Sequence, residues 1–165
     1  AKLPTVFKKD GTVTAGNSAG INDAAAAVVV MSAEKAQELG LNPRLRWVGR
    51  GVSGVDPSIM GIGPVPSTRK VLEKTGLTLE DIDQIELNEA FAAQALFVIR
   101  ELGMDIEKTN VNGSGISLGH PVGATGAIMV VKLMEELERR DQQRGLITMW
   151  VSGCPGVSTL YDRIP

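Results

Sequence analysis

The sequence has only one cysteine, Cys154, and only one histidine, His120, among its 165 residues. A single cysteine cannot form a disulfide within the chain, and one cysteine with one histidine falls short of the ligand sets that bind zinc. The sequence therefore predicts neither a disulfide framework nor a metal site.

Aromatic residues, excess charge and long apolar runs are scarce as well. Aromatic side chains make up 4% of the sequence, and the formal net charge is -2. Few rings can stack on bases and no basic excess attracts phosphates, so nucleic acid is not an expected partner. No apolar run approaches the roughly 20 residues of a membrane span, and the first residues lack the layout of a signal peptide. We expect no membrane contact, and a location in the cytoplasm or, after removal of a targeting sequence, in an organelle matrix.

The apolar content, 43% of the residues, is enough to build the core of one domain. We expect that domain to cover residues 1–165, with 1–22 as a loop-rich leading segment. Apolar runs, alternating patterns and glycine stops predict strands at 24–31, 44–55, 84–87, 146–151 and 157–161, and helices at 32–38, 67–75, 89–102 and 123–140. This order, with a closing hairpin at the end, predicts an α/β fold with a mostly parallel sheet.

The run at residues 24–31 has three successive valines, which favour a strand buried on both faces of the sheet. Its alanines leave a helix open as the alternative.

His120 lies in a glycine-dense run, residues 110–126, that leads directly into a predicted helix. Glycines permit positive φ and close backbone approach, and Pro121 stiffens the position after the histidine. An imidazole held in such a loop is suited to proton exchange near neutral pH. Composition alone fits a polar loop with a capping histidine equally well.

Asn88 falls at a predicted strand-to-helix junction. An amide there can hold a water that donates to an oxyanion. Taken by itself, the position favours a simpler role as N-cap of the following helix.

Three motifs in one order carry a resemblance to a known family. They are Thr-Ala-Gly-Asn-Ser-Ala-Gly-Ile-Asn-Asp at 14–23, Asn-Glu-Ala-Phe at 88–91, and the glycine-dense run at 110–126 around Gly-His-Pro. Together they make the chain resemble the C-terminal half of a thiolase, an acyl-CoA C-acyltransferase, over essentially its whole length. The resemblance implies one half of a layered αβαβα body, with a mostly parallel five-stranded sheet between helices.

The resemblance also implies roles for particular residues. His120 corresponds to the histidine that deprotonates a thiol and steadies a thioester oxyanion, and Asn88 to the asparagine that holds a water at a second oxyanion. Ser18, Ala19, Gly119 and Gly153 fall at positions expected to contact substrate. The implied substrate is a coenzyme A thioester, with no further cofactor.

The departures from the family pattern bear on activity. Nothing in this chain matches the first half of a thiolase, which carries the nucleophilic cysteine. Trp150 stands where the family has its second catalytic cysteine, and an indole cannot perform that proton transfer. Cys154 lies four residues later, either as a substitute thiol or as a small half-buried residue without a role. Ala19 stands where the family usually has serine, and Ser18 precedes it.

Two interpretations remain open from the sequence. In the first, the chain is the C-terminal half of a thiolase-like enzyme, inactive by itself and working beside an N-terminal half. In the second, it is a non-catalytic or engineered thiolase-fold domain that binds a ligand or itself. As a hybrid of the two, copies of the chain pair where the absent half would sit, so we expect a homodimer through a broad apolar surface formed by the helices at 89–102 and 123–140. The alternative is an engineered monomer whose surface there is polar.

Overall fold

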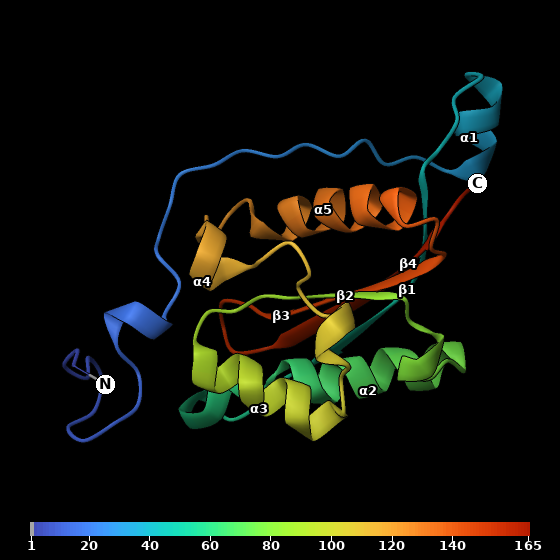
Figure 1. Ribbon diagram of the computed structural model, residues 1–165. Coiled ribbons are helices and arrows are strands. Elements are labelled where there is room, and N and C mark those ends of the chain that lie inside the picture. Colours follow the sequence, from blue (N-terminus) through green and yellow to red (C-terminus); the bar gives the residue numbers. More distant parts are fainter. Residues whose placement is uncertain (1) are drawn as a thin grey trace.

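The computed structural model describes residues 2–165 and contains a mixed four-stranded sheet (Figure 1). The strands are β1 (Leu45–Ser53), β2 (Gln84–Leu87), β3 (Arg144–Trp150) and β4 (Gly156–Arg163), in the order β1-β4-β3-β2. Only β2 and β3 run parallel, while β4 is antiparallel to both β1 and β3. The predicted α/β fold and closing β3–β4 hairpin are confirmed, but the prediction of a mostly parallel five-stranded sheet is wrong in strand count and in direction.

Residues 24–31 account for part of that difference. They are extended but belong to none of the named strands, and Val29 and Val30 are each 86% exposed. In Figure 1 this segment passes above the helix α5 toward α1 without joining the sheet. The prediction of a buried strand here is wrong because the apolar pattern needs neighbouring strands on both sides. The described residues supply none at this place.

The other edge of the sheet carries the remnant of a fifth strand. Thr109 forms a single parallel bridge to Ile85 of β2, and regular pairing does not continue beyond it. The open edge of β2 is therefore closed by a loop.

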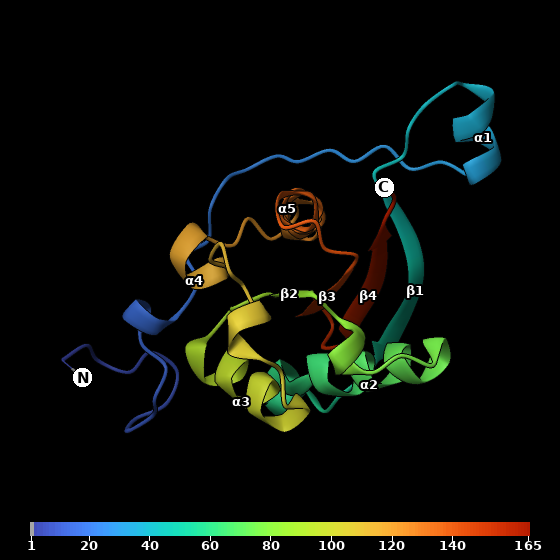
Figure 2. The same cartoon turned by 45° about the vertical axis from the view of Figure 1, so that its right-hand side comes forward.

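Helices cover both faces of the sheet (Figures 1 and 2). The helices α2 (Pro64–Thr75) and α3 (Ala92–Leu102) lie on one face, and α5 (Thr125–Arg139) lies on the other. On one face of the sheet, Leu146 lies in the same apolar core as Val98 of α3. On the other face, Ile147 lies in a second core with Leu133 of α5. Since α3 and α5 lie on opposite faces, the prediction that they form one broad association surface is wrong.

Local sequence signals set most helix ends. Ser32 caps α1 (Ala33–Glu38) by accepting a hydrogen bond from Lys35 N, as its position predicts. Gly76 and Gly103 end α2 and α3 with φ of 69° each, the left-handed geometry that favours glycine. The short α4 (Gly115–Leu118) was not predicted, because its four residues lack a helical apolar period. Three-ten helices occupy Ala15–Asn17, Pro57–Ile62, Leu79–Asp81 and Ile106–Lys108.

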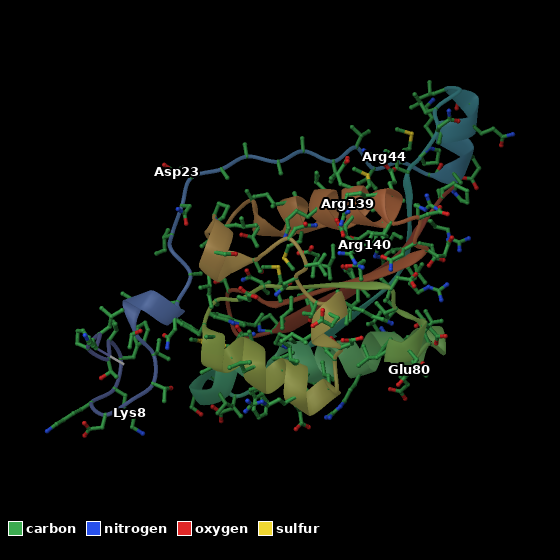
Figure 3. All side chains as sticks on the ribbon, viewed as in Figure 1. Lys8, Asp23, Arg44, Glu80, Arg139 and Arg140 are labelled. Atoms are coloured by element: carbon green, nitrogen blue, oxygen red, sulfur yellow. The ribbon has the colours of Figure 1, made fainter. Side chains whose placement is uncertain are left out.

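In Figure 3 the chain leaves the site at Asp23 and passes over α5 before it returns to the sheet at Arg44. Arg44 then ties the returning chain to the end of α5 through ion pairs with Glu135 and Glu138. These ion pairs are exposed, so each contributes little to the free energy of folding. Across residues 2–165, no helix combines the length and apolar character needed to cross a membrane.

Candidate functional site

The site forms where the parallel strands β2 and β3 end. Asn88 follows directly after β2, and its backbone N donates to Thr148 O of β3 at 3.0 Å. Trp150 ends β3 two residues farther on. Because the carboxyl ends of adjacent parallel strands share one edge of a sheet, the register brings both positions to the same place.

His120 lies against Asn88 at this edge. The Nε2 atom of His120 is 3.4 Å from Nδ2 of Asn88. The expectation that both side chains lie on loops at one sheet edge is therefore confirmed. The simpler role of Asn88 as a helix cap is wrong, because α3 begins at Ala92 and Phe91 occupies its N-cap position.

Asn88 is almost fully buried, with 1% of its surface exposed. Its side-chain oxygen Oδ1 finds no hydrogen-bond partner among residues 2–165. A buried polar atom without a partner is costly, so such atoms commonly mark a position that a water or ligand completes. The amide therefore retains hydrogen-bonding capacity beside the imidazole.

Thr125, at the start of α5, holds the other side of the imidazole. His120 Nδ1 lies 2.7 Å from Thr125 Oγ1, and that hydroxyl donates to Pro121 O at 2.9 Å. With its own proton directed to Pro121, Oγ1 accepts from Nδ1–H, which leaves the Nε2 lone pair facing Asn88. Burial also lowers the pKa of His120, which favours the neutral ring. Sequence reasoning missed Thr125, although a hydroxyl in the first helical turn after Gly-His-Pro is a usable signal.

We expect Thr125→Val to change the tautomer of His120. Valine keeps the shape of threonine but removes the acceptor for Nδ1–H, so the Nε2–H form should gain population at the expense of Nδ1–H. Imidazole ¹⁵N shifts of the sole histidine report this directly. A Thr125→Ser control retains the hydroxyl and should keep the wild-type tautomer, and an unchanged tautomer in Thr125→Val would contradict the assignment.

The leading segment brings the first motif to the same site. Ala19 N donates to Ala90 O at 2.9 Å, and His120 N donates to Gly20 O at 2.9 Å. Gly119 has φ of 97°, and a Cβ there would lie 2.3 Å from Asn22 Oδ1, so both backbone shape and space require glycine. The three motifs, far apart in sequence, therefore meet at one place.

The four residues predicted to contact substrate differ in burial and in their hydrogen-bond partners. Ser18 donates its hydroxyl to Thr14 O at 2.7 Å, within its own loop, and Ala19 beside it is half-buried. Gly119 adjoins His120, whereas Gly153 is exposed in the β3–β4 turn with φ of 84°. Contact of any of the four with substrate stays a prediction.

The two departures from the family pattern lie at the end of β3 and in the turn that follows it. Trp150 is half-buried, and its Nε1 is a buried donor that meets no acceptor within residues 2–165. Cys154 is half-buried at φ of 72°, a strained backbone for a residue with a Cβ. No hydrogen bond of the described part of the chain links Cys154 to His120. A substitute-thiol role for Cys154 stays a prediction.

A buried ion pair supports the loop that carries His120. Lys132 of α5 donates to Glu86 Oε2 of β2 at 2.7 Å and to Gly113 O at 2.5 Å. Burial raises the pKa of Glu86, and the Lys132 ammonium opposes that rise. Lys132 thus joins three segments around the site: β2, the glycine loop and α5. Sequence reasoning missed it, because nothing in the chain near Lys132 indicates a buried partner.

Metal binding finds no support in the described residues. Within 2–165, no cluster of three or more His, Cys, Asp or Glu side chains is arranged to hold a metal ion.

Comparison with known sequences identifies two adjoining profiles. The profile "Thiolase, C-terminal domain" matches residues 41–163, and "Thiolase, N-terminal domain" matches residues 1–34. The expectation that nothing in the chain matches the first half of a thiolase is therefore wrong for residues 1–34, although that stretch contains no cysteine. The acetyl-CoA acetyltransferase of Syntrophomonas wolfei is 53% identical over 99% of this chain, and the β-ketothiolase BktB of Cupriavidus necator is 55% identical over 99%. The chain spans 42% of the length of each of these relatives.

Solved structures show the same likeness. An acetyl-CoA acetyltransferase from Bacillus anthracis superposes with a TM-score of 0.96 at 54% identity, covering 99% of this chain and 41% of that one. Human mitochondrial 3-ketoacyl-CoA thiolase, solved in complex with CoA, superposes with a TM-score of 0.91 at 45% identity, covering 99% and 42%.

Proposed function

Because the chain belongs to the thiolase family, we propose that it is the C-terminal portion of an acyl-CoA C-acyltransferase. The reaction is the thiolysis of a 3-ketoacyl-CoA, or the reverse Claisen condensation of two acyl-CoA thioesters. The observation that carries the proposal is the 3.4 Å contact of His120 Nε2 with the Asn88 amide. The proposed substrate is a coenzyme A thioester, and the reaction needs no further cofactor.

In this mechanism His120 moves one proton. Its Nε2 takes the proton of the attacking thiol, and the resulting imidazolium donates Nε2–H to the thioester oxyanion. The Asn88 amide holds a water that donates to a second oxyanion, and the unpartnered Oδ1 atom of Asn88 supports this role. The Thr125 hydroxyl keeps the lone pair of Nε2 directed to the site. The acyl-accepting thiol itself comes from outside this chain.

We expect the pure chain to show no thiolysis of acetoacetyl-CoA and no condensation of acetyl-CoA. The family's acyl-accepting cysteine has no counterpart here, and Trp150 has no group that exchanges a proton with the substrate carbon. The assay follows absorbance of the 3-ketoacyl thioester with and without free CoA. Turnover above buffer that disappears in His120→Ala would contradict this prediction, and its loss in Cys154→Ser would identify the nucleophile.

The alternative is a non-catalytic or engineered thiolase-fold domain that serves as a binding or self-associating module. Trp150 at the second cysteine position favours it, because a bulky indole occupies space that the family leaves for substrate. Ligand binding distinguishes the catalytic function from the non-catalytic one. Calorimetry with CoA and with acetyl-CoA on the joined protein described in the Discussion gives binding only if the pocket remains open.

We propose an N-terminal thiolase half as the partner of this chain. The N-terminal profile matches residues 1–34. Within them, the apolar segment 24–31 is extended, exposed and outside the sheet. Such a segment gains most by pairing with a sheet that another half provides. In this proposal residues 1–165 pack as one unit, in which 41–163 carry the C-terminal profile and the leading segment 1–22, within the N-terminal profile, docks beside Ala90 and His120. The predicted location in the cytoplasm or an organelle matrix belongs to this proposal.

Without that partner, we expect the chain to form a homodimer through the exposed valines of segment 24–31. Exposed apolar side chains in an unpaired strand favour association. Light scattering at micromolar concentration should give twice the 17.5 kDa of one chain. The double change Val29→Lys and Val30→Lys should shift the mass to the monomer, because both side chains are exposed and their loss leaves the core intact.

The matched control is Ile59→Lys, an exposed apolar residue in the three-ten helix beside α3. It should leave the dimer unchanged. A strict monomer with a cooperative unfolding transition in the unmodified chain would rule out the dimer.

A further inference from the structure

The open edge of β2 is closed by the side chain of Asn110. Its Oδ1 accepts from Leu87 N at 2.8 Å, and its Nδ2 donates to Leu87 O at 2.8 Å. The carboxamide carries the same acceptor and donor as a peptide group, so it satisfies the ladder positions that a fifth strand would fill. A side chain has replaced a strand residue at this edge.

The contacts of Asn110 lie on both sides of Asn88. Besides its two bonds to Leu87, Nδ2 donates to Glu89 Oε1 at 2.8 Å. The backbone of Asn110 adds a third anchor, because its N donates to Ile85 O at 2.8 Å. The residues before and after Asn88 are therefore tied to one amide. From the opposite side, Asn88 N is tied to β3.

The backbone of Asn110 has φ of 53°, in the left-handed region. Asparagine enters this region more readily than most residues with a Cβ. The left-handed turn at Asn110 follows the bridge of Thr109 and starts the loop toward His120. One residue thus ends the pairing along β2 and supplies the amide that replaces it.

We propose that Asn110 is a positioning residue that holds Asn88 against His120 by closing the edge of β2 with its side-chain amide. Asn110 makes no contact with the reacting atoms and acts through the backbone on either side of Asn88. The inference rests on the proposed role of Asn88 at the site. Its test uses no turnover, so it and the proposed function can fail separately.

The test is Asn110→Gly in the full 165-residue chain. Glycine accepts φ of 53° and adds no charge, so only the amide is lost. The matched control is Asn112→Gly, two residues along the same loop, where the lost side chain bonds Glu136 Oε2 at 2.8 Å instead. Because His120 is the sole histidine, its imidazole signals identify themselves.

Two readouts are measured by NMR in each variant. The Leu87 N–H, which loses its acceptor, should exchange with solvent at least about tenfold faster in Asn110→Gly, as expected for one lost hydrogen bond. The pKa of His120 should rise toward its ordinary value of 6.5, because a displaced Asn88 admits water to the ring. The Asn88 side-chain amide signals should shift in parallel, and Asn112→Gly should leave all three unchanged.

Faster exchange at Leu87 with an unmoved His120 pKa and unmoved Asn88 signals would overturn the proposal, since Asn110 would then support the fold alone. Unchanged exchange at Leu87 would overturn it as well. If Asn110→Gly does not fold, Asn110→Asp keeps the acceptor for Leu87 N and loses both donated bonds, with Asn112→Asp as the control of equal charge. Failure of both Asn110 variants to fold would also count against a positioning role.

Discussion

Replacing Trp150 with cysteine should turn on thiolysis in a protein that joins this chain to the N-terminal portion of the Syntrophomonas wolfei relative. That relative is 53% identical over 99% of the chain, so the two portions should pack against each other with few mismatches. The joined protein supplies the missing nucleophile, and Trp150→Cys supplies the missing proton carrier. General acid–base catalysis contributes about 10²- to 10⁴-fold, and we expect a gain of that size in kcat.

Two variants distinguish proton transfer by the new thiol from the volume that removal of the indole opens. Trp150→Ala opens the same volume without a thiol and should stay close to the parent, whereas His120→Ala in the Trp150→Cys background should remove the gain. The measurement is the decay of acetoacetyl-CoA absorbance with CoA in excess. Equal rates for Trp150→Ala and Trp150→Cys would show that the indole acts by blocking the pocket. A joined parent as fast as Trp150→Cys would refute the role assigned to this position.

Lys132→Met should destabilise the chain by about 3–5 kcal/mol at neutral pH, the cost of leaving a buried carboxylate without its partner. The Glu86 side chain is 3% exposed and that of Lys132 18%, so water cannot replace the lost charge. The same change also removes a donor to Gly113 O in the loop before His120. Chemical unfolding with and without the substitution gives the difference in free energy.

The loss should depend on pH in one direction. Burial raises the pKa of Glu86, and Lys132→Met removes the ammonium that opposes the rise. A carboxyl whose pKa is higher in the folded state than in the unfolded state stabilises the folded state while it is protonated and destabilises it once it is ionised. The destabilisation should therefore be smallest below the ordinary value of 4.5 and grow as the pH rises through the folded pKa.

Two controls accompany Lys132→Met. Adding Glu86→Gln should recover much of the loss, because no unpaired charge remains buried. Lys70→Met removes an exposed lysine that donates to Val52 O, and it should cost within about 0.5 kcal/mol. A loss in Lys132→Met that does not vary with pH and is not reduced by Glu86→Gln would contradict the account of the pair.

Local signals were enough to predict several elements. The strand at 84–87 was predicted with the bounds that the structure shows, and Ser32, Gly76 and Gly103 cap their helices as expected. Each of these depends on residues within one or two turns of chain, where side-chain type acts directly on backbone geometry. The motifs around Asn88 and His120 likewise identified two residues that the structure brings together.

Predictions that depended on distant partners were less reliable. Segment 24–31 has the composition of a buried strand, yet a strand is buried only where other strands flank it. The sequence predicts that α3 begins at Glu89, but Phe91 is extended and the helix starts only at Ala92. The apolar pattern predicts a largely buried α3, which is wrong, because Leu96 and Phe97 are 44% and 46% exposed. The pattern also could not reveal that α3 and α5 lie on opposite faces of the sheet.

The sequence by itself thus determined the family, the local elements and the two residues that face each other at the candidate site, because motif and cap chemistry is short in range. Only the tertiary structure decided which residues hold that pair in place. Lys132 and Asn110 act through contacts with residues 46 and 23 positions away, whereas Thr125 contacts His120 only five positions before it. A hydrogen bond between distant segments depends on how the chain folds back, and no local pattern records that path.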